Sequence, residues 1–559
     1  GESAYYLSIG LFLLFLAGFV VWLIYLARYF HHRSLTISAP FPYWKRGGAV
    51  LIGACLIGLC IFGIRGRTGY NPIKVSAAYF CQDAFLNQLG VSPTFNLLTS
   101  VMDDMRPENK YLHLMDEQEA ITKAQALLNR PGDANVSPLA VYRRAAKADS
   151  VQQRRPNVVL IMMESMSAKF MKHFGQSETL TPFLDSLYTR SISFRNFYSA
   201  GIHTNHGLYA TLYSFPAMMK RNLMKGSVIP RYSGLPTVLK ENGYYNLFFM
   251  THEGQYDNMN AFFRTNGYDE VFSQEDYPAD KVVNSFGVQD DFLYDYAIPV
   301  LNQRAATGQP FFATLLSISN HPPYVIPPFF HPKTSEPEMQ IVEYADWALR
   351  QFFEEARKQP WFDNTIFVLE GDHGKLVGDA ECELPESYNH IPLMIYSNRI
   401  QPEEKTAFGG QVDIQPTILG LLNIDYLQNN FGVDLLKEER PCMFYTADNM
   451  VVGRNDTLLY LYNYETQQEL TYDIGNGKLN AVPMDDSFLP LKEYSFSMLQ
   501  SAEFLVKHGK TLNSIPFTQQ LGVVSVFSGC CFLTNLYILA ICRSTRLGDF
   551  HIPPQTDTL

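Results

Sequence analysis

Short apolar runs alternate with helix-like stretches between residues 156 and 422, and this rhythm limits the possible folds more than any other feature. Runs such as residues 158–163 and 311–318 are apolar almost without interruption, which is typical of strands buried on both faces of a sheet. The alternation predicts an α/β fold with a mainly parallel sheet flanked by helices. The other expected strands are residues 192–197, 246–250, 365–369 and 391–396, and the expected helices are residues 182–189, 235–242, 290–304, 338–357 and 414–422.

Five of the expected strands are followed closely by a group that can bind a metal ion or a phosphate. In chain order these groups are Glu164, Thr204, His252, Asn320 with His321, and Asp372 with His373. Each group alone is weak evidence, because a Glu after a strand is usually a solvated turn residue and a lone His is usually structural. The carboxyl ends of parallel strands meet at one edge of a sheet, where the sites of such folds lie. Their recurrence at these ends therefore favours one shared site.

The residue types at these positions suit metal-assisted chemistry. Glu164 and Asp372 offer oxygen ligands and His373 offers an imidazole, a set that accepts manganese, magnesium or zinc. A divalent ion lowers the pKa of a nearby hydroxyl, and Thr204 supplies one. The residues that follow the loop containing Thr204, 208–213, are expected to open a helix, and its N-terminus would point backbone N–H groups at an anion. Ser199 is the competing hydroxyl in the same loop.

The overall charge excludes one large class of partner. The chain has 44 Lys and Arg residues against 55 Asp and Glu residues, a formal net charge of −11. A nucleic-acid binder normally presents a basic face, so we expect no nucleic acid as a partner. The hydrophobic content of 47% and the low charged content of 18% exclude a mainly disordered chain.

Two charge-free apolar runs near the start of the chain predict membrane helices. Residues 6–27 and 47–64 are 22 and 18 residues long, about the length that crosses a bilayer core of roughly 30 Å. The loop between them carries four basic residues and no acidic one, so the positive-inside rule places it in the cytoplasm. The rest of the chain is then extracytoplasmic, and we expect a multi-pass protein of the cell membrane.

The pattern along the chain gives a layout of five parts. We expect a transmembrane region at residues 1–66, a helical stalk at 67–150 and a catalytic domain at 151–440, completed by a β-rich element at 441–518. Residues 519–559 contain a third charge-free run and are expected to form a C-terminal membrane segment, unless they are a cloning-derived or misread tail.

These residues together resemble the alkaline phosphatase superfamily, and within its sulfatase-like branch the lipoteichoic acid synthase-like phosphoglycerol transferases. The motifs that carry the resemblance are residues 157–165, 180–184, 199–207, 319–324, 371–374 and 413–417. The resemblance implies one divalent ion, usually manganese, with magnesium or zinc in relatives. The ligands that it implies are Glu164, Thr204, Asp372 and His373, with Thr204 also the nucleophile.

The resemblance also implies a reaction and its partners. A membrane-anchored enzyme would move phosphoglycerol from a phospholipid head group to a hydroxyl of a glycan or glycolipid, through a phospho-threonine intermediate. His321 would lie near the phosphate and the leaving group, and His252 near the head group. The further substrate-binding candidates are Asp257, Asn258, Asn320 and His206. The ordinary alternatives for these are turn formation for the Asx residues and helix capping for the histidine.

Departures from the family pattern leave other functions open. The synthases have an arginine after the equivalent of His252 that this chain lacks at that place, and residues 257–259 look more like glucan-decorating relatives. The Cys/Ser-x-Pro-x-Arg motif of sulfatases is absent from residues 199–207. The alternatives are phosphoethanolamine transfer, hydrolysis of a phosphodiester or sulfate ester, and a non-catalytic protein that binds an envelope glycan.

Overall fold

The computed structural model describes residues 17–32, 43–68, 72–81, 84–106, 109–131, 133–143, 155–226 and 229–512. The chain divides into two compact units, residues 1–73 and residues 74–559. The expected C-terminal membrane segment and the first part of the run at residues 6–27 lie outside the described residues.

The first unit is helical where it is described. Residues 17–32 form one helix and α2 (Tyr43–Arg65) forms another, which contains the whole of the second predicted span. Apolar side chains of α2 such as Leu51 and Ile64 are exposed. Within the described ranges, no helix meets the combined length and apolarity required for crossing a membrane.

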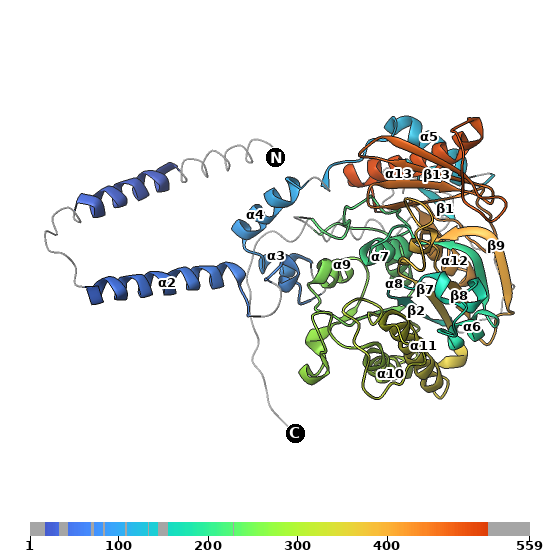
Figure 1. Ribbon diagram of the computed structural model, residues 1–559, viewed down its shortest axis with the longest axis horizontal. Coiled ribbons are helices and arrows are strands. Elements are labelled where there is room, and N and C mark those ends of the chain that lie inside the picture. The colour runs from blue at the N-terminus through green and yellow to red at the C-terminus, as the bar shows by residue number, and fades with distance from the viewer. Residues whose placement is uncertain are drawn as a thin grey trace, which may run out of the picture. The chain divides into compact units, whose positions relative to one another are not determined.

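An eight-stranded sheet forms the centre of the second unit (Figure 1). Its strand order is β5-β4-β6-β2-β7-β8-β3-β9, and only the pairs that β8 makes, with β7 and with β3, are antiparallel. The mainly parallel sheet predicted from the apolar runs is therefore present. The strands are β2 (Asn157–Met163), β3 (Ile192–Tyr198), β4 (Tyr245–Met250), β5 (Glu270–Phe272), β6 (Phe311–Leu316), β7 (Thr365–Gly371), β8 (Leu393–Tyr396) and β9 (Glu403–Gly410).

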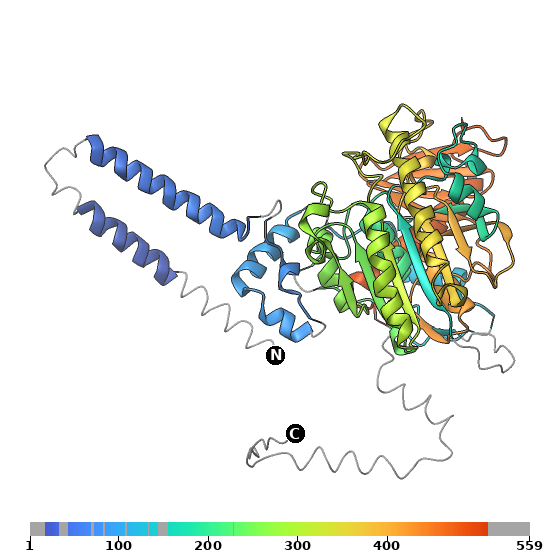
Figure 2. The same ribbon diagram turned by 90° about the horizontal axis from the view of Figure 1, so that it is seen from below.

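Helices cover both faces of this sheet, which explains the uninterrupted apolar runs. Val159 and Ile161 of β2 belong to a core shared with α10 and α11, whereas Val158 and Leu160 belong to a core shared with α7 and α8. Helices α10 and α11 pack side by side over their face (Figure 2). The helices of this region are α6 (Pro182–Tyr188), α7 (Thr204–Tyr213), α8 (Leu235–Glu241), α9 (Met259–Thr265), α10 (Asp290–Ala306), α11 (Pro337–Ala356) and α12 (Ile414–Leu421).

The six strands and five helices expected between residues 156 and 422 are all present, and no end differs by more than two residues. The elements missed there are α7, which was expected only as a helix opening after Thr204, together with α9 and the edge strands β5 and β9. Five of the eight residues of strand β9 are exposed or intermediate, so it lacks the apolar run of the buried strands.

A second, antiparallel sheet follows the first in the sequence. Its order is β11-β12-β13-β14-β15, and helix α13 (Leu489–Lys507) packs on β11 and β12. The β-rich element expected here omitted this 19-residue helix. The strands are β11 (Met443–Ala447), β12 (Met450–Arg454), β13 (Leu458–Asn463), β14 (Gln468–Asp473) and β15 (Asn480–Ala481).

Residues expected to form a stalk are partly packed onto this second sheet. Helix α5 (Glu117–Leu128) packs along α13, and Asp116 caps its start by accepting from the backbone N–H groups of Gln118 and Glu119. The preceding helices are α3 (Ala84–Leu89) and α4 (Pro93–Asp104), and a short strand pair joins β1 (Val141–Arg143) to β10 (Tyr426–Gln428).

Candidate metal and phosphoryl-transfer site

Three of the predicted metal ligands meet at the carboxyl edge of the main sheet. Glu164 follows β2, and Asp372 and His373 follow the neighbouring strand β7. One ligand atom from each lies within 4.8 Å of the others. His373 Nε2 is 3.8 Å from Glu164 Oε1 and 3.6 Å from Asp372 Oδ2. Adjacent parallel strands thus bring together residues 208 positions apart in the sequence.

The predicted nucleophile Thr204 lies beside this cluster. It is the first residue of α7, and its hydroxyl donates to Glu164 Oε2 over 3.4 Å. Helix α7 comes unusually close to the β7 edge, because a Cβ at Gly207 would lie 2.2 Å from the carbonyl oxygen of Asp372. Only glycine fits at this close approach, which holds the helix start against the acidic pair.

The competing hydroxyl, that of Ser199, makes hydrogen bonds away from the acidic cluster. It is buried, and its Oγ donates to the carbonyl of Gly201 over 2.8 Å and accepts from Asn389 Nδ2 over 3.2 Å. Among the two hydroxyls left open by the sequence, Thr204 is therefore the one that contacts a carboxylate of the cluster.

The two carboxylates are held without water around them. Glu164 is 2% exposed and Asp372 is fully buried. Burial, and then the repulsion of Asp372, raise the pKa of Glu164 well above its ordinary value. Asp372 Oδ1 accepts from the backbone N–H groups of Ser165 and His373, whereas its Oδ2 is buried with no hydrogen-bond partner within the described part of the chain.

These features fit a bound divalent cation. An orphaned carboxylate oxygen and two mutually repelling buried acids are costly without a positive charge between them. A hard or borderline ion such as manganese, magnesium or zinc accepts this mixture of oxygen and imidazole ligands. Glu164, Asp372, His373 and Thr204 are the residues that would hold it.

Three histidines of the site share one tautomer. The ring Nδ1 of His252, His321 and His373 lies 2.7–3.1 Å from a backbone carbonyl, which can only accept a hydrogen bond. Each Nδ1 therefore carries the proton and each Nε2 keeps a free lone pair. For His373 this is the atom that faces the carboxylates. Burial lowers the pKa of both His252 and His321, so their neutral forms are favoured.

Asn320 links the cluster to a half-buried lysine, Lys375. Its Nδ2 donates to the carbonyl of Ser165, and its Oδ1 accepts from Lys375 Nζ over 2.7 Å. Lys375 also donates to the hydroxyl of Tyr324 and lies 3.3 Å from a carboxylate oxygen of Glu338. Burial lowers the pKa of this lysine. The site thus carries a fixed cation beside its acidic pair.

Two of the other predicted substrate-binding residues lie around the start of α7. Asp257 Oδ2 accepts from Asn205 Nδ2 over 3.3 Å, and its Oδ1 pairs with Lys225 at 2.8 Å. Asn258 is buried in a left-handed conformation (φ 66°), and its amide donates to a backbone carbonyl. Asp257 therefore contacts Asn205, the residue that follows Thr204, whereas the side-chain amide of Asn258 is used in a hydrogen bond within the fold.

His206 lies on α7 two residues after Thr204 and is fully buried. Neither of its ring nitrogens has a partner among the described residues, and burial holds its pKa well below the ordinary value. It does not cap the helix, and neither does the side chain of His203, which occupies the N-cap position.

Several residues that hold the site were missed from the sequence. Ser165 Oγ donates to Glu164 Oε1 over 2.7 Å, and Ser317 Oγ accepts from the Glu164 backbone N–H. Gln411 donates to the Asp372 carbonyl over 2.7 Å and accepts from the backbone N–H of Ala200, which joins the β7 edge to the loop before α7. A signal existed for Ser165, which stands in the motif at residues 157–165, whereas Gln411 and Ser317 lie outside the motifs noted above.

The comparisons with known proteins define the class of the domain. Residues 156–424 match the protein family described as Sulfatase. A structure of an alkaline phosphatase superfamily protein from Vibrio parahaemolyticus aligns with a TM-score of 0.64 and 26% sequence identity, covering 72% of this chain and 98% of that one. Residues 156–424 are therefore similar to sulfatase domains, and the α/β fold predicted from the sequence is that of the alkaline phosphatase superfamily.

The curated relatives belong to a narrower group, the lipoteichoic acid synthases. Lipoteichoic acid synthase 2 of Bacillus subtilis (strain 168) is 24% identical over 315 residues, which are 51% of this chain and 47% of that protein. Lipoteichoic acid synthase of Staphylococcus aureus (strain USA300) is 23% identical over 374 residues, 59% of this chain and 54% of that protein. The chain spans about half the length of the curated relatives it matches. The predicted resemblance to lipoteichoic acid synthases is thus confirmed.

A solved structure of the lipoteichoic acid synthase LtaP from Listeria monocytogenes aligns with a TM-score of 0.55 and 21% identity, covering 63% of this chain and 93% of that one. At this identity the likeness concerns the fold alone.

Proposed function

We propose that this chain is a membrane-anchored, metal-dependent phosphotransferase that moves phosphoglycerol from a phospholipid head group to a hydroxyl of a glycan or glycolipid. The observation that carries the proposal is the position of the Thr204 hydroxyl, 3.4 Å from Glu164 Oε2 and at the start of a helix, beside the cluster of Glu164, Asp372 and His373. Sequence similarity to lipoteichoic acid synthases supports the choice of donor and acceptor.

The residues of the cluster divide the work between holding a cation and presenting a nucleophile. Manganese is our first choice of ion, and when bound it would neutralise charge on the phosphoryl oxygens and favour the alkoxide of Thr204. Glu164 accepts the hydrogen bond of the Thr204 hydroxyl and orients it. Thr204 is the first residue of α7, so the backbone N–H groups of the first turn would favour an incoming phosphate.

The first chemical step forms the bond between Thr204 Oγ and phosphorus and breaks the bond between phosphorus and the diacylglycerol oxygen. The hydroxyl proton of Thr204 leaves as the bond forms, and the diacylglycerol oxygen gains one proton. His321 is the residue proposed to carry that proton: its Nε2 lone pair first takes up a proton equivalent to the one lost by Thr204 and then gives it to the diacylglycerol oxygen. Its ring is fixed by the Nδ1 hydrogen bond and by contact with Phe286.

The second step transfers phosphoglycerol from Thr204 to the acceptor. The acceptor hydroxyl oxygen bonds to phosphorus, the bond to Thr204 Oγ breaks, and the proton lost by the acceptor restores the threonine hydroxyl. Lys375 and Asn320 lie beside the cluster, where they favour a negatively charged phosphoryl group. His252 and Asp257 are proposed to contact the glycerol head group. The membrane anchor fits a lipid donor and remains part of the proposal.

The deciding experiment is incubation of the purified protein and manganese with labelled phosphatidylglycerol or phosphatidylethanolamine. We expect diacylglycerol from phosphatidylglycerol, together with a phosphoglycerol adduct on the peptide that contains Thr204. Diacylglycerol from phosphatidylethanolamine alone would replace the proposal by phosphoethanolamine transfer. Free glycerol phosphate with no transfer to any glycan would indicate a hydrolase, and no product from either lipid would support a non-catalytic protein.

A further inference from the structure

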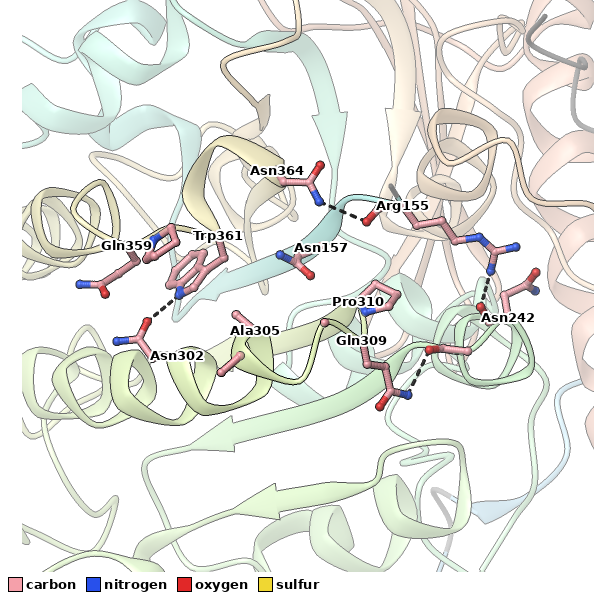
Figure 3. Close-up of a pocket in the computed structure, with 14 residues that line it drawn as sticks. Arg155, Asn157, Asn242, Asn302, Ala305, Gln309, Pro310, Gln359, Trp361 and Asn364 are labelled. Carbon is pink, nitrogen blue, oxygen red and sulfur yellow. Dashed lines mark hydrogen bonds between the residues drawn. The ribbon is translucent and has the colours of Figure 1, made fainter. Parts of the chain in front are cut away.

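A pocket of about 680 Å³ lies at the amino edge of the main sheet, opposite the edge that carries Thr204 (Figure 3). Asn157 begins β2, Pro310 directly precedes β6 and Asn364 directly precedes β7, and all three line it. Strands of six or seven residues at about 3.3 Å per residue place the two edges roughly 20 Å apart. The pocket is therefore separate from the candidate active site.

The lining is unusually rich in side-chain amides and poor in charge. Of the fourteen lining residues, Arg155 is the one charged residue, and none is acidic. A site without a carboxylate is unsuited to a metal ion or an amine, and a single guanidinium is a weak counterpart for a polyphosphate. The six carboxamide residues of the lining are Asn157, Asn242, Asn302, Gln309, Gln359 and Asn364.

Hydrogen bonds fix which end of each amide is left for a ligand. The indole N–H of Trp361 donates to Asn302 Oδ1 over 2.6 Å, which leaves Asn302 Nδ2 as a donor (Figure 3). Gln309 Nε2 donates to the carbonyl of Gly243, and Gln359 Nε2 donates to a carbonyl in the last turn of α11. Their Oε1 atoms are left as acceptors, and we find no partner for them in the part of the chain that the structure describes.

Asn242 follows the same rule, because its Nδ2 donates to a carbonyl of α8 and its Oδ1 is left over. Asn157 and Asn364 differ, since both ends of each amide are used within the fold. The pocket therefore offers three acceptor oxygens and the amide N–H groups that the fold does not use, including both of those on Asn302 Nδ2. The guanidinium of Arg155 donates one hydrogen bond to the Asn242 carbonyl.

We propose that this pocket binds a neutral, polyhydroxylated ligand, namely a saccharide of two or three sugar units. Hydroxyl groups donate and accept, so they match a lining that offers neutral amide acceptors and donors and has no acid to attract a cation. The volume of about 680 Å³ lies within the usual range for small-molecule pockets. Apolar atoms of Pro310, Pro360 and Ala305 supply the surface against which the C–H faces of sugar rings pack.

The test is ligand-observed NMR on the purified full chain with maltose, cellobiose and N,N′-diacetylchitobiose, in buffer free of sugar-headed detergent. We expect saturation transfer to at least one of these probes. The double variant Gln309→Ala with Gln359→Ala should weaken binding by about tenfold or more, since two neutral hydrogen-bond partners are lost. Ala306→Trp at the pocket wall should abolish it, because the indole fills the space.

Two variants serve as controls. Gln303 is an exposed glutamine of α10, the helix that also carries Ala306, but it does not line the pocket. The Gln303→Ala variant should therefore bind saccharide as the wild type does. Thr204→Ala should also keep full saccharide binding, so loss of transfer activity and loss of this site are told apart. No saturation transfer with any probe up to about 10 mM, or binding that survives Ala306→Trp, overturns the proposal. Tetraalanine serves as a peptide probe in the same NMR experiment. Saturation transfer to tetraalanine but to no saccharide overturns the proposal as well.

Discussion

The two edges of the main sheet are built from the same strands and carry opposite kinds of side chain. At the carboxyl edge, four ionisable groups lie close together: Glu164 and Asp372 are buried, and His373 and Lys375 are half-buried. At the amino edge, the pocket has six amides and a single charge. The strands therefore determine where the two edges lie, while the loops at each edge determine which side chains are present. An edge lined by neutral amides is suited to ligand binding rather than to catalysis.

Thr204, the proposed nucleophile, gives the sharpest test of this contrast. Thr204→Ala removes the hydroxyl that contacts Glu164, and we expect transfer activity to fall by at least about 10³-fold with the fold intact, because a covalent route is lost. Diacylglycerol release measured alongside thermal unfolding checks both parts. The matched control is Ser199→Ala, which changes a hydroxyl that is bonded to Gly201 and should leave most activity. Equal losses in the two variants would reject Thr204 as the nucleophile.

Metal binding should appear as a gain in stability. At a manganese concentration a hundred times its Kd, the native state should be stabilised by roughly 2.7 kcal/mol, and the thermal midpoint should rise. Asp372→Asn should abolish this rise. Without metal the same variant should be at least as stable as the wild type, because it removes the charge that repels Glu164 and keeps an oxygen to accept the two backbone N–H groups.

The control for the metal test is Asp379→Asn, which neutralises an exposed acid of the following loop and should keep the full response to manganese. A rise in the midpoint of Asp372→Asn as large as that of the wild type would place the ion somewhere else.

The same glycine-to-alanine change can be made at each edge. At Gly207, a Cβ would press on the Asp372 carbonyl at 2.2 Å, so Gly207→Ala should cost about 1–3 kcal/mol and shift Thr204, with loss of activity. At Gly308 the added Cβ meets open space, but the φ of 76° is unfavourable for alanine, so Gly308→Ala should cost about 1 kcal/mol and leave activity unchanged. Denaturant unfolding and transfer assays on both variants check the pair. Equal activities would mean that the α7 contact does not position Thr204.

The main features of the carboxyl edge were predictable from the sequence, because they depend on two simple regularities. Uninterrupted apolar runs marked the strands, and the residues directly after them, Glu164 and Asp372, had to meet at one edge once the sheet was parallel. The spacing of Leu491, Met498 and Ala502 on α13 is also typical of a helix. The prediction of a β-rich element for this segment did not use that pattern.

Other features had no such regularity. Gln411 holds the site through the backbone carbonyl of Asp372 and the backbone N–H of Ala200, and a contact with backbone leaves no pattern of residue types. The pocket at the amino edge could not be predicted from the sequence either. Two of its lining residues, Asn242 and Asn364, stand in turns, where asparagine is common for local reasons. Only the folded arrangement shows which end of each amide faces the space.

The smallest predicted effect concerns the lysine beside the cluster. Lys375 is held by Asn320 and Tyr324 at 2.7 and 3.1 Å, so its charge is fixed near the acidic pair rather than free in solvent. Lys375→Met should lower kcat/KM by about tenfold, mainly through KM, because a charge-assisted contact with a phosphoryl group is lost. The matched change at the opposite edge is Lys358→Met, whose exposed ammonium pairs with Glu355 and should leave kinetics unaltered. Since salt screens a half-buried charge less than an exposed one, most of the effect at Lys375 should persist at high ionic strength. An effect that disappears with added salt would mean that this lysine acts only through the general field of the protein and makes no direct contact with the donor.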